Sequence, residues 1–295
     1  MFCTRTHLSF VCHSRVTYFL RFPPTGGLIC RLCNILGSIL AVVWLINRLM
    51  IKDAKTDFLI IGTRQQLEKT SIESIIIGDT VIKPLEGVRN LGSWFDAHTR
   101  MNVHIGKICS KAFRGLYNIR QIRKFLTVQS TKILIHAFVS SHLDYCNALL
   151  FGLPKYQLDS LQKVQNAAAR VTFQIAKFDH ITPALIDIHW LPVTFRVQFK
   201  FLLFVYKSLH NHSPSYIKDL LSLKPAANYA LRSSAQSLLF VPKVNCSTLG
   251  DRAFAHAAPV LWNSLPLTIR TSSNFTIFKK QLKTHLFKKA FNLLE

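Results

Sequence analysis

The hydrophobic and polar positions between residues 57 and 96 follow a strand-like pattern. Short runs rich in β-branched and aromatic residues, bounded by turn-forming residues, are typical of β-strands. The predicted strands cover residues 57–63, 74–77, 80–82 and 88–95, and Gly78-Asp79 forms a predicted two-residue hairpin turn. Strands this short need a partner layer to be stable, so we expect a small antiparallel sheet packed against other elements.

After Asp96 the apolar residues recur with the period of an α-helix. At about 100° per residue, five of them fall in one narrow arc: Ile105, Ile108, Ala112, Leu116 and Ile119. Arg100, Lys107, Lys111 and Arg114 fall on the opposite side, which predicts an amphipathic helix with one core face and one face for anions. An ordinary solvated face is the alternative. Such a face normally mixes acids with its bases, however, and this one has no acid.

The remaining sequence predicts mostly helices. A helix over residues 128–151 would place five residues on one face and end at Gly152 and Pro154; these five are Leu134, Ala137, Phe138, Tyr145 and Ala148. Further helices are expected at residues 157–173, from Thr182-Pro183, at 193–209 after Leu191-Pro192, and from Ser213-Pro214 to Leu221.

The C-terminal part contains both the loosest stretch and a strongly basic helix. Residues 224–260 are interrupted by Pro225, Pro242, Gly250 and Pro259. Ser273 is expected to cap a last helix that ends at Phe291. Its inward residues would be Phe275, Phe278, Leu282 and Leu286, and lysines 279, 280, 283, 288 and 289 would cover the rest.

Together these elements predict an α+β fold that is mostly α, with a small antiparallel sheet followed by a helical bundle. We divide the chain into residues 1–43, an apolar and basic segment; 44–98, short strands; 99–221, a helical region; and 222–295, a region ending in the basic helix.

The charge balance changes the picture by pointing to a polyanionic partner. The 295 residues include 37 Lys and Arg against 14 Asp and Glu, a net charge of +23. Such a surface attracts nucleic acid or anionic membrane. Bases without acids are concentrated between Asp96 and Asp144, and the candidate phosphate contacts are Arg100, Lys107, Lys111, Arg114, Arg120, Arg123 and Lys124. A solvated basic protein without a particular partner is the alternative.

Candidate chemistry is sparse. The seven cysteines lack the spacing of a secreted scaffold and are interpreted as reduced thiols of an intracellular protein. Cys30 and Cys33 form half of a zinc motif, but no second pair completes it. His142, Asp144 and Cys146 lie close in sequence, yet residues two apart on a helix do not face each other. Packing is therefore favoured over a catalytic site there.

Two other features have alternative interpretations. Trp190 and Trp262 each precede a proline break, where tryptophan usually packs a helix end; base stacking is the alternative. The apolar stretch at residues 35–46 is shorter than the roughly 20 residues of a spanning helix. Residues 1–43 are therefore interpreted as an unrelated or degraded segment outside the folded domain, with a membrane anchor over residues 28–50 as the alternative.

The order of several segments resembles the reverse transcriptases of non-LTR (LINE) retrotransposons, with jockey-like elements the most similar. "WLINRLMIKDAKTDFLIIGTRQQ" (44–66) and "VRNLGSWFD" (88–96) resemble the distal palm. The segment "IRKFLTVQSTKILIHAFVSSHLDYCNALLFGLPKYQLDSLQKVQNAAARV" (122–171) resembles the thumb and post-thumb helices. "FDHITPALIDIHWLPVTFRVQFK" (178–200), "SPSYIKDLL" (213–221), "LRSS" (231–234), "RAFAHAAPVLWNSLPLTIR" (252–270) and "FKKQLKTHLFKKAF" (278–291) continue the similarity.

This resemblance implies a palm remnant followed by a thumb-like bundle, without the polymerase site. In the family, carboxylates that bind two Mg²⁺ ions precede the segment at Trp44. Here no Asp-Asp pair occurs, and Asp53, Asp57 and Asp96 match positions downstream of the catalytic pair. We expect a truncated, non-catalytic fragment with no metal, no cofactor and no small-molecule substrate, which binds RNA or DNA weakly and without sequence choice. A translated relic without function and a membrane-anchored basic protein are the alternatives.

Overall fold

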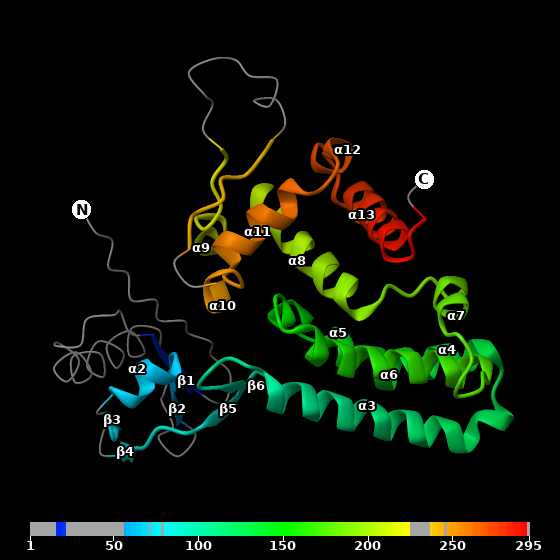
Figure 1. Cartoon of the computed structure of the whole chain (residues 1–295), viewed down its shortest axis with the longest axis horizontal. Helices are drawn as coiled ribbons and strands as arrows, with labels where there is room; N and C mark the ends of the chain where they lie inside the picture. Colours follow the sequence, from blue (N-terminus) through cyan, green and yellow to red (C-terminus); the bar gives the residue numbers. More distant parts are fainter. Residues whose placement is uncertain are drawn as a thin grey trace. The chain divides into compact units, whose positions relative to one another are not determined.

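The computed structural model describes residues 16–21, 56–70, 72–77, 80–224, 237–244 and 247–293. The fold is α+β and mostly helical, with small sheets, as the sequence predicts (Figure 1). The chain divides into two compact units, Met1–Gly106 and Lys107–Glu295, and each is described by itself. The predicted Gly78-Asp79 turn, the Cys30 and Cys33 pair and the apolar stretch at 28–50 lie outside the described residues.

The described strands of the first unit form three two-stranded sheets. β3 (Ile75–Ile77) pairs antiparallel with β4 (Thr80–Ile82), as predicted. β2 (Thr56–Ile61) was also predicted, but it pairs in parallel with β1 (Val16–Arg21), a strand that was not predicted. The expectation of antiparallel pairing alone was therefore wrong. The continuous apolar run Phe58–Ile60 is buried, which is typical of a strand covered on both faces.

The predicted strand over residues 88–95 is instead a hairpin. β5 (Gly87–Asn90) pairs antiparallel with β6 (Ser93–Asp96), and the short helix α2 (Arg64–Glu68) precedes both along the chain. The turn residues Leu91 and Gly92 have φ angles of 45° and 86°. Two-residue hairpin loops need positive φ at their centre, so Gly92 marks a turn and not the interior of a strand.

The helix α3 (Asn102–Ile122) confirms the predicted amphipathic pattern. All five residues of the predicted core face are buried: Ile105, Ile108, Ala112, Leu116 and Ile119. The helix begins in the first unit, and its residues from Lys107 onward belong to the second. A 3-10 turn, η2 (Arg123–Phe125), follows it.

The predicted continuous helix over residues 128–151 is wrong. α4 (Val128–Ile135) leads into a π-helical turn, η3 (His136–Ser140), and then into α5 (Ser141–Asp144). The left-handed residue Cys146 (φ 51°) then separates α5 from the 3-10 turn η4 (Asn147–Leu150). The chain thus leaves the helical path before residue 147.

The π turn also changes which face is buried. Residues Thr131, Ile135, Val139 and Leu143 are buried, at a spacing of four, whereas Phe138 and Tyr145, which were predicted to share one face, are more than half exposed. A four-residue spacing drifts around a regular α-helix, but the wider π turn accommodates it. Extrapolating the ordinary helical period across this turn therefore selected the wrong face.

The next helices follow the sequence closely. α6 (Lys155–Phe173), α7 (Thr182–Asp187) and α8 (Val193–Leu209) match the predicted 157–173, Thr182-Pro183 and 193–209. The proline signals explain this agreement, because Pro154 and Pro192 occupy the caps of α6 and α8. α9 (Ser215–Lys218) is shorter than predicted.

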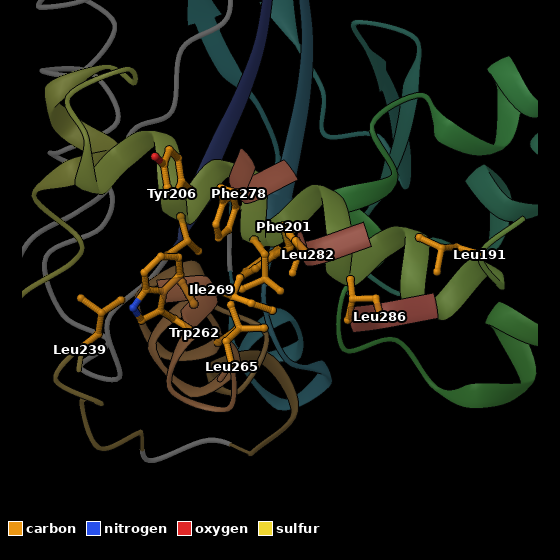
Figure 2. Close-up of a cluster of buried hydrophobic side chains, with 14 residues drawn as sticks. Leu191, Phe201, Tyr206, Leu239, Trp262, Leu265, Ile269, Phe278, Leu282 and Leu286 are labelled. Atoms are coloured by element: carbon orange, nitrogen blue, oxygen red, sulfur yellow. The ribbon is translucent and has the colours of Figure 1, made fainter. Parts of the chain in front are cut away.

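A C-terminal core joins α8 to the last helices, α11 (Phe254–Asn263), α12 (Leu267–Arg270) and α13 (Phe275–Ala290). Figure 2 shows Phe201 and Tyr206 of α8 meeting Trp262, Ile269 and Phe278. The Tyr206 and Phe278 rings stack with centroids 4.2 Å apart. Leu239 is fixed to this core by both amide atoms of Asn263, at 2.9 Å each.

One prediction for this region was wrong, and another is tested only in part. The stretch predicted to be loosest contains α10 (Ser247–Gly250) and most of α11, in which Pro259 is accommodated, while residues 225–236 and 245–246 lie outside the described residues. The side chain that caps α13 belongs to Asn274, which accepts a hydrogen bond from the Thr276 amide at 2.7 Å, and not to Ser273. The predicted inner face of α13 is confirmed, since Phe278, Leu282 and Leu286 are buried.

Candidate nucleic-acid interface

The structure divides the predicted phosphate contacts into separate groups. Lys107, Lys111 and Arg114 are exposed on one face of α3. Arg120 lies nearly opposite these three around the helix axis, since residues advance by about 100°. Lys124 is exposed in η2, and Arg100 is exposed in the first unit. The predicted contacts within the second unit therefore do not form one surface.

A groove of about 630 Å³ brings Arg120 and Arg123 together with bases from another part of the chain. It lies between the end of α3 and the end of α6, which run side by side (Figure 1). Its lining residues are Arg120, Arg123, Lys163, Asn166, Ala167, Arg170, Val171, Gln174, Ile175 and Lys177. Five of these ten are cationic and none is acidic. We call this feature the basic groove.

Arg123 fixes the geometry of the basic groove. Its guanidinium donates to the carbonyl oxygens of Val171 (2.9 Å), Thr172 (2.7 Å) and Leu126 (2.8 Å). It thereby satisfies carbonyls near the end of α6 and ties them to the turn after α3. Because three of its N–H donors are used in this way, we assign Arg123 a positioning role, and its predicted phosphate contact stays a prediction.

Arg170 performs a similar task at the end of α6. Its Nε donates to the Ala176 carbonyl at 3.3 Å and its Nη2 to the Asp179 carbonyl at 3.1 Å. Asp179 thus contributes its backbone oxygen to this contact. The loop after α6 is held against the helix end.

Arg120, Lys163 and Lys177 are the groove bases available for a ligand. All three are exposed. Among the described residues, the ion pairs join Arg64 to Glu68, Arg196 to Asp144 and His256 to Asp251, so no carboxylate neutralises these groove cations. Clustered cations on low-dielectric walls create a positive potential that favours phosphate groups.

Sequence reasoning missed Lys163, Arg170 and Lys177. Lys163 and Arg170 are seven residues apart and so lie on one face of α6. That spacing was visible in the sequence, but nothing indicated that this face of α6 would meet the end of α3. The pairing depends on tertiary packing, including the Cys109 thiol, which lies 3.7 Å from the Ser160 carbonyl oxygen.

A second hollow, of about 420 Å³, lies beside Arg196 in the same unit. Arg196 pairs with both carboxylate oxygens of Asp144, at 3.0 and 3.1 Å. Burial lowers the pKa of His136, which also lines this hollow, and the nearby Arg196 charge lowers it further. Asp144 thus serves as the partner of an arginine. Packing of Tyr145 and Cys146 was predicted for this segment, but Tyr145 is 51% exposed and Cys146 is only partly buried.

Trp190 and Trp262 are packing residues. Trp262 is 1% exposed and Trp190 is 5% exposed, so neither ring face is open to a base. The Trp262 Nε1 donates to the Ser237 carbonyl at 3.2 Å, which satisfies the indole inside the core.

No group of three or more His, Cys, Asp and Glu side chains within the described residues is arranged to hold a metal ion. No described helix combines the length and the apolar character needed to cross a bilayer.

Comparison with known proteins gives no match: neither family models, nor curated proteins, nor solved structures resemble the chain significantly.

Proposed function

We propose that the chain is a nucleic-acid-binding protein of the non-LTR reverse transcriptase lineage, and that it does not itself carry out polymerisation. The lineage is supported by the ordered sequence motifs from residue 44 to residue 291. The non-catalytic assignment rests on chemistry, since nucleotide addition through two Mg²⁺ ions needs clustered carboxylates and the sequence has no Asp-Asp pair.

The observation that carries the binding proposal is the acid-free basic groove. Its cations come from the end of α3, from η2, from the middle and end of α6 and from the loop after α6, and two arginines hold that arrangement through backbone carbonyls. Phosphates would contact Arg120, Lys163 and Lys177, whose charges have no acidic partner among the described residues. Contacts of this kind position a nucleic-acid backbone and carry no sequence information, so the expected binding is non-specific.

The test replaces the three available groove bases together. In the groove variant, Arg120→Gln, Lys163→Gln and Lys177→Gln, we expect the affinity for a fluorescent 20-nucleotide RNA or DNA to fall at least tenfold in an anisotropy titration. Arg123 and Arg170 are not substituted, because their hydrogen bonds to backbone carbonyls maintain the shape of the groove.

The matched control is an α13 variant, Lys280→Gln, Lys288→Gln and Lys289→Gln, which removes the same charge from exposed positions elsewhere. Its affinity is expected to fall much less. Equal losses in both variants would show that total charge, and not the basic groove, determines binding.

A further inference from the structure

Two phenylalanines close in the chain to residues that line the basic groove are unusually exposed. Phe178 is 90% exposed and Phe125 is 77% exposed, the two highest values among the exposed large apolar residues described. Each directly follows a lysine in the chain, Lys177 or Lys124. Single exposed apolar residues are common on protein surfaces, so exposure alone assigns these two rings no role. Their neighbours in the chain and their charged partners indicate one.

Both rings lie next to groove residues in the chain. Phe178 follows Lys177, which lines the groove, and Phe125 comes two residues after Arg123, which also lines it. The Lys177 ammonium lies 5.4 Å from the Phe178 ring centroid, and the Lys124 ammonium lies 4.9 Å from that of Phe125. Each site thus combines a positive charge with an open aromatic face.

The backbone on which each ring sits is fixed by a groove arginine. Arg170 donates to the carbonyls of Ala176 and Asp179, on either side of Phe178. Arg123 donates to the carbonyl of Leu126, the residue after Phe125. Holding a contact residue in place before binding reduces the entropy lost on binding.

We propose that the basic groove takes single-stranded nucleic acid, with bases stacked on Phe125 and Phe178 while the phosphates lie along Arg120, Lys163 and Lys177. In a duplex the base faces are already stacked on each other, so an exposed ring gains little from them. An unpaired strand offers its base faces to aromatic side chains without regard to sequence. This inference rests on the proposed function and adds that the bound nucleic acid is single-stranded.

The experiment compares a fluorescent dT20 strand with the same strand paired to dA20, in the same buffer, for the wild-type chain and for Phe125→Ala, Phe178→Ala and the double variant. Each substitution is expected to weaken single-strand binding on the order of tenfold. Duplex binding and the melting temperature are expected to stay unchanged, because both side chains are exposed.

Two further variants separate stacking from simple apolar contact. Phe178→Trp is expected to keep the single-strand affinity, while Phe178→Leu is expected to lose it as the alanine variant does. Retention of full affinity by Phe178→Leu would overturn the stacking assignment.

Other outcomes distinguish this inference from the proposed function. Equal losses for strand and duplex in the alanine variants, or no loss for either, would overturn the single-strand proposal; the groove variant could still support nucleic-acid binding. Absence of binding to either probe at low salt would overturn both. Loss of a wild-type dimer in the double variant, with unchanged strand affinity, would assign the rings to self-association and overturn the proposal.

Discussion

Arg120 and Arg123 lie three residues apart but have different roles. Arg120 is exposed in the basic groove, whereas Arg123 is half-buried and donates to three carbonyls. We therefore expect Arg123→Ala to lower the free energy of unfolding by about 1–3 kcal/mol, because three buried or half-buried carbonyls lose a charged donor.

Urea denaturation of both alanine variants measures this difference. Arg120→Ala is expected to stay within about 0.5 kcal/mol of wild type, as surface substitutions usually do. If Arg123→Ala were as stable as Arg120→Ala, the positioning role of Arg123 would be wrong.

At the residue scale, His104 is expected to make the free energy of unfolding depend on pH. It is buried, its Nδ1 accepts a hydrogen bond from the Trp94 amide at 3.4 Å, and its Nε2 has no partner among the described residues. Burial lowers its pKa below the ordinary value of 6.5, so protonation favours the unfolded chain. Its stabilising effect is fully present above pH 6.5 and is lost as the pH falls through the lowered pKa.

The measurement is the free energy of unfolding between pH 7.5 and pH 5. Wild type is expected to lose stability on acidification, and His104→Gln is expected to lose less. His180→Gln, at an exposed position, should follow wild type. A His104→Gln profile that is parallel to wild type would contradict the assignment.

At the element scale, the glycines of α3 show where helices approach each other closely. A Cβ at Gly115 would lie 3.0 Å from the Phe138 carbonyl oxygen in the π turn, whereas a Cβ at Gly106 would meet nothing within 4 Å. Alanine stabilises an exposed helical position relative to glycine by up to about 1 kcal/mol.

Gly106→Ala is therefore expected to raise the melting temperature, and Gly115→Ala to lower it, because the obstructing atom at Gly115 is backbone. Thermal denaturation of the two variants gives the comparison. A stabilising Gly115→Ala would show that η3 can move away from α3 at little cost.

The sequence predicted an element correctly where apolar residues recur at a regular spacing and where residues that begin or end a helix mark its limits. α3, α6 and α8 have uninterrupted apolar stripes, and prolines cap α6 and α8. It failed where the chain departs from an ideal period, at the π turn η3 and at the Leu91-Gly92 turn. Ser273 and Asn274 are adjacent cap-forming residues, so only the backbone geometry decides between them.

At the scale of the whole molecule, the charge of +23 predicted a polyanion partner but not where it would bind. Local sequence pointed to the exposed face of α3. The basic groove, however, combines Arg120 with Lys163 and Lys177, which are more than 40 residues further along the chain. A site built from tertiary contacts cannot be derived from helix periodicity alone, although the basic residues themselves were visible.

The most direct test of the central claim is the salt dependence of single-strand binding by wild type and the groove variant. The logarithm of the binding constant should fall linearly with the logarithm of KCl concentration, by about 0.7 for each phosphate neutralised on a single strand. Removal of Arg120, Lys163 and Lys177 should therefore reduce the slope by about 2, while the α13 variant keeps most of it. Equal slopes for wild type and the groove variant would contradict the assignment of the basic groove as the nucleic-acid interface.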